Sequence, residues 1–169
     1  KMYIGGKQAR PDGGYTTKVY NPNGQYVGDV SEGNRKDIRN AVEAASKSTS
    51  WAGKTGHARA QVLYFIAENM EYRKQEFALR IAQSISVSLE TALEEVDLSI
   101  QRIYYYAAMA DKYDGNVHHT LSRNITMAMP EAIGTMAVVC PNEAPLLGFV
   151  STVIPVIAMG NNAVVIPSE

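Results

Sequence analysis

Apolar residues gather most densely in the last part of the chain, where short turn signals separate them into three runs. Thr135 to Cys140 is a β-branched and apolar run ending before Pro141, the pattern of a strand buried on both faces of a parallel sheet. Leu146 to Met159 is almost wholly apolar and follows Pro145, a residue suited to the first turn of a helix. Ala163 to Ile166 forms the third run.

These runs predict a strand–helix–strand unit, in which the two strands are parallel and the crossover is right-handed. In open parallel sheets, ligands bind outside the carboxyl ends of the strands. The candidate binding segments are therefore Cys140–Ala144 and Pro167–Glu169.

Two long helices are predicted in the middle of the chain. Apolar residues recur at helical spacing from His57 to Gln83 and again, in steps of three and four, from Leu89 to Tyr113. The segment Ser84–Ser88 is assigned to the junction between them. The second helix carries an acidic series that predicts a solvated helix face: Glu90, Glu94, Glu95 and Asp97.

The first third of the chain is organised around turns. Asn23-Gly24 is a strong signal for a two-residue hairpin turn. A helix is predicted from Arg35 to Ser48, capped by Asn34 or Ser31, with one apolar face formed by Ile38, Val42 and Ala45. Four short strands are expected before that helix, at Met2–Ile4, Lys7–Arg10, Tyr15–Tyr20 and Tyr26–Val30.

Composition narrows the possible partners. The 169 residues are 46% apolar and carry a net charge of −1, so the chain can bury a core and shows no basic footprint for nucleic acid. The longest apolar run, Ala144 to Met159, is interrupted by prolines and is too short to span a bilayer, and no secretory signal opens the chain. A single cysteine excludes a disulfide framework and favours a reducing compartment, hence a cytoplasmic location.

Residues that suggest chemistry have simpler structural interpretations. Cys140 is the only thiol, and its place at the end of a buried strand predicts a packing role. His118 and His119 lack further ligands for a metal and are interpreted as an exposed turn. Leu121 to Pro130 alternates in polarity and predicts an exposed strand.

The order and spacing of several short motifs resemble the aldehyde dehydrogenase superfamily. The matches are Tyr3–Lys7 (Y-I-G-G-K), Tyr20-Asn21-Pro22 with Gly24, Arg39–Ala45 (R-N-A-V-E-A-A), Tyr105–Lys112, and the strand–helix–strand unit itself. In that family the first strand ends in a P-W-N-F-P turn and the second in K-P-S-E. The resemblance covers this whole chain and about the first third of a family member.

The resemblance implies an α/β fold: the amino-terminal part of a Rossmann-type NAD-binding domain, with short hairpins and a β-strand of oligomerisation type. It implies three parts, namely hairpins and helices over 1–120, a projecting β-element over 121–132, and the first strand–helix–strand of the NAD-binding-like sheet over 133–169. It also implies NAD as cofactor, through Cys140, Pro141, Asn142 and Glu169.

Two departures from the family affect its functional positions. Glu143 replaces the family's Asn, whose amide stabilises the oxyanion of the reacting aldehyde, and a carboxylate repels that charge. Ile166 replaces the family's ribose-binding Lys and offers no donor, whereas Glu169 keeps the family's ribose-binding acid. With C-P-N-E-A-P-L-L-G-F-V-S and V-V-I-P-S-E, the chain is most similar to the second, degenerate module of the family-16 aldehyde dehydrogenases.

Three hypotheses for function follow. The chain is the amino-terminal part of an active NAD(P)-dependent dehydrogenase that uses a cysteine nucleophile beyond Glu169. Alternatively, it is a pseudoenzyme module kept for assembly or for binding another protein, or a vestigial module that binds NAD without turnover. The departures at Glu143 and Ile166 favour the second hypothesis. The expected partners are a homo-oligomer or the remainder of a longer dehydrogenase chain, without nucleic acid or membrane.

Overall fold

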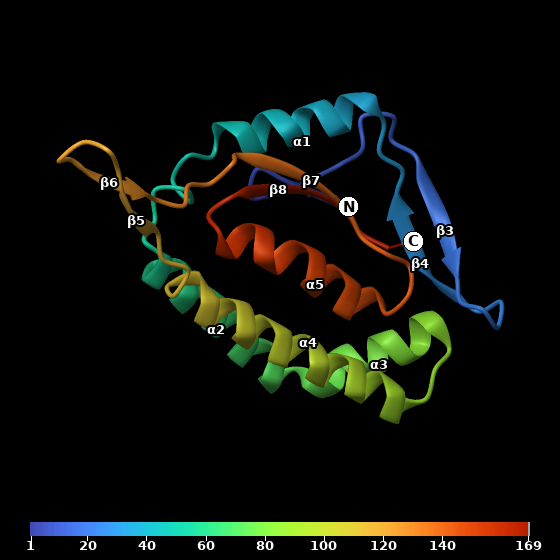
Figure 1. Ribbon diagram of the computed structural model, residues 1–169. Coiled ribbons are helices and arrows are strands. Elements are labelled where there is room, and N and C mark those ends of the chain that lie inside the picture. The colour runs from blue at the N-terminus through green and yellow to red at the C-terminus, as the bar shows by residue number, and fades with distance from the viewer. Residues whose placement is uncertain (169) are drawn as a thin grey trace.

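The computed structural model describes residues 1–168 and places a parallel strand pair between helices (Figure 1). Strands β7 (Thr135–Val139) and β8 (Asn162–Ile166) pair in parallel, and helix α5 (Pro145–Ala158) connects them. Helix α1 (Arg35–Lys47) contacts one side of this pair, and α5 packs on the other with Val153 against Val138 and Cys140. The predicted strand–helix–strand unit is therefore confirmed.

The main core lies where α5 meets the long helices α2 (Gly56–Tyr72) and α4 (Leu89–Ala110). Leu63, Val96 and Ile103 are among its largest fully buried side chains. The apolar series predicted on α4 packs here as expected, except that Leu89 is exposed at the start of the helix. Because α5 is buried between the strand pair and these helices, its apolar composition extends around most of its surface.

The single helix predicted from His57 to Gln83 is wrong, because α2 ends at Tyr72 and α3 (Lys74–Ile85) begins after Arg73. The helical geometry is interrupted at this one residue, whose backbone N–H donates to the carbonyl oxygens of Asn69 and Met70. A one-residue break leaves the apolar spacing on each side helical, so the sequence pattern alone does not reveal it.

The apolar residues predicted to share one face of α1 do not form a buried face. Ile38 and Val42 are exposed, whereas Asp37 is buried at 4% exposure. The Asp37 carboxylate accepts the backbone N–H of Asn34 in a capping box and also accepts the backbone N–H of Asp12, so this polar residue turns toward the protein. Asn34 is the N-cap, as one of the two predicted alternatives stated.

Three antiparallel hairpins surround the helical body. β1 (Met2–Ile4) pairs with β2 (Lys7–Ala9), and β3 (Thr16–Tyr20) pairs with β4 (Tyr26–Ser31). The predicted two-residue turn at Asn23-Gly24 is wrong, because residues 21–25 all lie in the connection. The side-chain oxygen of Asn21 accepts the backbone N–H groups of Asn23 and Gln25 and so shapes this longer turn.

The third hairpin projects from the body, as Figure 1 shows for β5 (Asn116–His119) and β6 (Ile125–Ala128). The exposed strand predicted within Leu121–Pro130 is confirmed as β6. The turn predicted at His118 and His119 is wrong, because both residues lie in β5, although both are exposed as expected. The projecting hairpin begins at Asn116, whereas the resemblance places the start of the projecting β-element at residue 121.

Candidate functional site

The two predicted binding segments meet at the carboxyl ends of β7 and β8. Val139 pairs with Ile166, and the backbone N–H of Cys140 donates to the carbonyl oxygen of Ile166 at 2.9 Å. The turn 141–144 then leads into α5, so the structure brings Cys140–Ala144 beside the end of β8 as predicted. Glu169, the expected ribose-binding acid, lies outside the described residues.

Cys140 occupies a packing position in this arrangement. The residue is 6% exposed, and its Sγ lies 3.7 Å from Oγ1 of Thr152 on α5. The thiol is enclosed between strand and helix, as the sequence predicts, and does not face the turn's solvent side.

The turn 141–144 is held in a strained and closely packed conformation. Ala144 adopts a left-handed backbone with φ of 49°, an uncommon conformation for a residue with a Cβ. Pro141 packs so closely on Gly148 that a Cβ at Gly148 would lie 2.6 Å from the proline Cγ. Glu143 is exposed between these two contacts. The carboxylate of Glu143 is therefore exposed to solvent on a turn whose backbone is held in place.

The end of β8 presents an apolar side chain to the same region. Ile166 is 47% exposed, and its partner Val139 is 72% exposed. Neither side chain can donate a hydrogen bond to a sugar hydroxyl or balance a phosphate charge. Pro167 follows, and it has no backbone N–H to offer.

The first turn of α5 receives a hydrogen-bond acceptor that sequence analysis missed. Glu95 of α4 accepts the backbone N–H groups of Leu146 and Leu147 through Oε1, at 2.8 and 3.1 Å. The prediction of a solvated acidic face is therefore wrong for Glu95, whereas Asp97 keeps a side chain that is 41% exposed and forms an ion pair with Lys74. The prediction is confirmed for Glu90 and Glu94, which are exposed.

The opposite end of α5 is also capped by side chains from elsewhere in the chain. Trp51 Nε1 donates to the carbonyl oxygen of Ile157 at 2.8 Å, and Arg59 Nε donates to that of Ala158 at 2.9 Å. A carboxylate at the first turn and a guanidinium at the last turn both match the helix dipole. These contacts at both ends hold α5 in place along its axis. They thereby also hold the turn 141–144, which precedes the helix.

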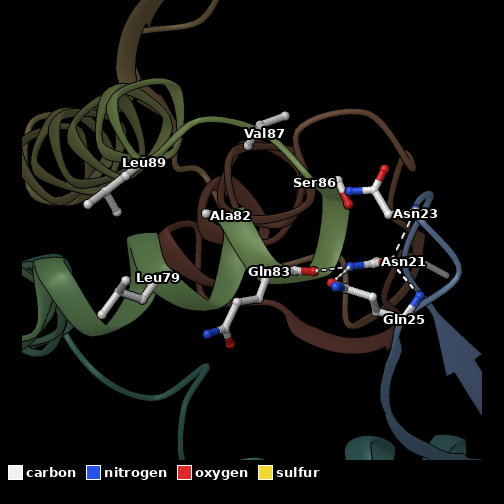
Figure 2. A pocket seen from close by; sticks show the side chains of 9 residues that line it. All are labelled: Asn21, Asn23, Gln25, Leu79, Ala82, Gln83, Ser86, Val87 and Leu89. Atoms are coloured by element: carbon white, nitrogen blue, oxygen red, sulfur yellow. Dashed lines mark hydrogen bonds between the residues drawn. The ribbon is translucent and has the colours of Figure 1, made fainter.

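A shallow cleft of about 350 Å³ lies between the β3–β4 turn and the end of α3 (Figure 2). Asn21 donates through Nδ2 to the carbonyl oxygen of Gln83, which ties the two walls together. Ser86 and Ser88 lie at the junction between α3 and α4, as predicted, whereas the same prediction is wrong for Ser84, which lies in the last turn of α3. The Oγ of Ser86 is buried without a hydrogen-bond partner among the described residues.

Two kinds of feature are absent from residues 1–168. No group of three or more potential ligands is arranged to hold a metal ion there. No helix within that range is both long and apolar enough to cross a membrane.

The parallel pair with its crossover helix defines the opening unit of a doubly wound α/β domain. The chain belongs to the aldehyde dehydrogenase family, whose family model matches residues 9–169. It is 35% identical to an aldehyde dehydrogenase from Agaricus bisporus, over 91% of this chain and 32% of that protein. It is 30% identical to a phenylacetaldehyde dehydrogenase from Pseudomonas fluorescens, over 100% of this chain and 36% of that protein.

Solved structures agree on the fold. A point mutant of betaine aldehyde dehydrogenase from Staphylococcus aureus, solved with NAD⁺, superposes with a TM-score of 0.94 at 26% identity. That match covers 99% of this chain and 34% of the solved chain. This chain therefore spans about a third of the length of these relatives. The comparisons carry no evidence for the narrower resemblance to the degenerate family-16 module.

The described residues can be tested against the NAD that the family implies. At the end of β8, Ile166 and Pro167 supply neither a side-chain donor nor a backbone N–H. At the start of α5, the amides of Leu146 and Leu147 already bond Glu95. Ile166 and Pro167 at the end of β8, and the paired amides at the start of α5, therefore do not fit the anionic and hydroxyl groups of a dinucleotide.

Proposed function

We propose that this chain is the amino-terminal part of an aldehyde dehydrogenase-type protein that is impaired in aldehyde oxidation and serves in assembly or in binding another protein. The observation that carries the proposal is Glu143, exposed in the turn at the carboxyl ends of the strands. The resemblance assigns this position to the amide that stabilises a developing oxyanion. An ionised carboxylate there opposes the charge that forms during the reaction.

Ile166 supports the same proposal for cofactor binding. Its exposed side chain stands where the resemblance places the ribose-binding Lys, and it cannot donate a hydrogen bond. NAD affinity is accordingly reduced, and a vestigial, non-catalytic NAD-binding role depends on Glu169 and on backbone groups. The narrower similarity to the degenerate family-16 module belongs to this proposal and rests on the same two replacements.

The projecting hairpin supports a role in assembly. Val117, Ile125 and Met127 are all at least 65% exposed on β5 and β6. Exposed apolar strands and unpaired strand edges favour association with another chain. The fitting partner is a second copy of the protein or the remainder of a longer dehydrogenase chain, in the cytoplasm, where a lone buried thiol stays reduced.

An active dehydrogenase is the second candidate function. It is favoured by the intact packing of β7, α5 and β8 and by similarity to relatives named as dehydrogenases. In such a protein the carboxylate of Glu143 would have to be turned away from the reacting aldehyde.

The two candidates differ in how a longer protein containing this chain responds to Glu143→Asn. We expect the unmodified protein to produce little NADH from NAD⁺ and simple aldehydes. Glu143→Asn combined with Ile166→Lys is expected to tighten NAD⁺ binding in calorimetry. Where a nucleophilic cysteine is present, it is also expected to raise turnover. Glu131→Asn, at another exposed glutamate, is the matched control.

Two results would contradict the proposal. One is vigorous aldehyde oxidation by the unmodified protein. The other is a double variant that improves neither NAD⁺ affinity nor turnover. Sedimentation of the same protein with Ile125 and Met127 changed to Ser tests the assembly role separately, since dissociation is expected only if the hairpin joins subunits.

A further inference from the structure

The projecting hairpin has two chemically different faces. In its antiparallel register, Val117 lies opposite Met127 and His119 lies opposite Ile125. Residues that lie directly opposite each other, or two apart on one strand, project from the same face of a sheet. One face of the hairpin therefore combines His119 with Val117, Ile125 and Met127. Each of these three apolar side chains is at least 65% exposed.

The other face of the hairpin is built from small and polar residues. His118 lies opposite Thr126, and Asn116 lies opposite Ala128. All four residues of β5 are exposed, so neither histidine is covered by its own chain. The two adjacent histidines thus share one strand and differ in their surroundings, since only His119 stands among large apolar side chains.

Within residues 116–128, no carboxylate faces His119. β5 packs against β6, whose sequence I-T-M-A contains no titratable residue. His118 projects from the opposite face, and Arg123 in the connection between the strands has the same charge sign as an imidazolium. Asp114 and Glu131 flank the hairpin at its base, whereas His119 ends β5 at the tip. A protonated His119 therefore has no counter-ion on the hairpin.

We infer that His119 is a proton switch for the assembly in which the proposed function places this hairpin. The inference rests on that proposed function and supplies its regulation. A neutral imidazole is compatible with an apolar contact, whereas burial of an imidazolium without a counter-ion is costly. Histidine is the side chain whose charge ordinarily changes between about pH 5 and 8. Association through this face is therefore favoured at neutral pH and opposed in mild acid.

The partner on this face is a second copy of the protein. The net charge of the chain is −1, so two copies repel each other little at neutral pH. The hairpin projects from the body, which leaves its apolar face free to meet the same face of another copy (Figure 1). In a two-fold contact the same surface supplies both sides, so each copy buries its own His119 and the effect of protonation is doubled.

Sedimentation of the protein that contains this chain, in mildly acidic and in neutral buffer, tests the switch. The association constant of the wild type should fall at least about tenfold from about pH 7.5 to about pH 5.5. His119→Gln is neutral throughout this range and should stay associated, whereas His119→Lys is charged throughout and should be dissociated. His118→Gln and His118→Lys make the same changes on the polar face and should behave as the wild type does. Circular dichroism at both pH values shows that each variant is folded.

Each outcome decides the inference. An association constant that does not change with pH in the wild type would overturn it, and this measurement needs no variant. A His119→Gln protein that keeps the wild-type response would also overturn it, as would equal dissociation by His119→Lys and His118→Lys. A monomer at every pH would exclude a second copy as the partner and would overturn it too.

The variant with Ile125 and Met127 changed to Ser separates this inference from the proposed function. If that variant dissociates at neutral pH while the wild type ignores pH, the hairpin joins subunits and only the switch is wrong. If it stays associated, the assembly role of the hairpin is wrong, and the switch is wrong with it.

Discussion

The indole Nε1 of Trp51 donates a 2.8 Å hydrogen bond to the carbonyl oxygen of Ile157, which lies 106 residues later in the chain. Arg59 Nε bonds the next carbonyl, that of Ala158. Together these donors add hydrogen bonds to carbonyl groups in the last turn of α5, where the Ile157 oxygen also accepts the backbone N–H of Gly160. The loop before α2 and α2 itself therefore set the position of the helix that follows the candidate turn.

Trp51→Phe should lower the free energy of unfolding by about 0.5–1.5 kcal/mol, because it removes one of the hydrogen bonds to the Ile157 carbonyl while keeping an aromatic ring. Urea unfolding followed by circular dichroism measures the change, since Trp51 is the only tryptophan and its fluorescence disappears with it. Tyr72→Phe, at a side chain that is 92% exposed, should leave stability unchanged. Equal stability of Trp51→Phe and the wild type would show that the hydrogen bond is dispensable.

Gly148→Ala should displace the candidate turn. The new Cβ would lie 2.6 Å from Cγ of Pro141, so the ring must move. The expected loss is about 1–3 kcal/mol of unfolding free energy, as for other overpacked positions. Amide resonances of Asn142 and Glu143 should shift.

Gly28→Ala provides the matched control for that change, because a Cβ at Gly28 meets nothing within 4 Å. It should alter neither stability nor the resonances of the turn. If Gly148→Ala behaved in the same way, the close approach of Pro141 would not be what holds the turn.

The sequence predicts the strand–helix–strand unit well because each element carries its own signal. Apolar runs mark β7 and β8, and Pro145 marks the start of α5. The contacts that complete the site carry no such signal. Glu95 belongs to an acidic series that is typical of a solvated face, and only the packing of α4 against α5 selects it as a cap.

Local patterns were misleading where a polar group serves the tertiary structure. Ile38 and Val42 have the spacing of a buried face, yet the capping box at Asp37 decides which side of α1 faces inward. The break at Arg73 is likewise invisible, since it preserves helical spacing on both sides. The contact of Asp37 with the backbone N–H of Asp12 also spans 25 residues of sequence, which single-segment patterns do not represent.

Lys36 should control the titration of Asp12. The hydrogen bond from Lys36 is the largest cause that lowers the pKa of Asp12, and Asn34 acts in the same direction. Because the pKa is lower in the folded chain than in the unfolded chain, this contact adds stability above the unfolded value. That stability is lost as pH falls through the folded value.

Lys36→Met should therefore raise the pKa of Asp12 toward that of an ordinary aspartate, as measured by NMR titration of the carboxyl carbon. It should also reduce the acid-induced loss of stability. Lys47→Met removes a charge from the other end of α1 and should leave the Asp12 titration in place. An unchanged Asp12 midpoint in Lys36→Met would contradict the assigned cause.

Ser86→Gly should stabilise the chain. Ser86 follows α3 with φ of 57°, a left-handed conformation that glycine adopts without the Cβ penalty, and its buried Oγ has no hydrogen-bond partner among the described residues. Removing both penalties should raise the free energy of unfolding by about 1 kcal/mol, after allowing for the greater freedom of glycine in the unfolded chain.

Ser84→Gly makes the same chemical change two residues earlier, inside the last turn of α3. It should instead lower stability by up to about 1 kcal/mol, because glycine is a poor helix former. Opposite signs in paired urea titrations would establish that backbone conformation at Ser86 sets the effect, whereas a loss of stability in both variants would refute it.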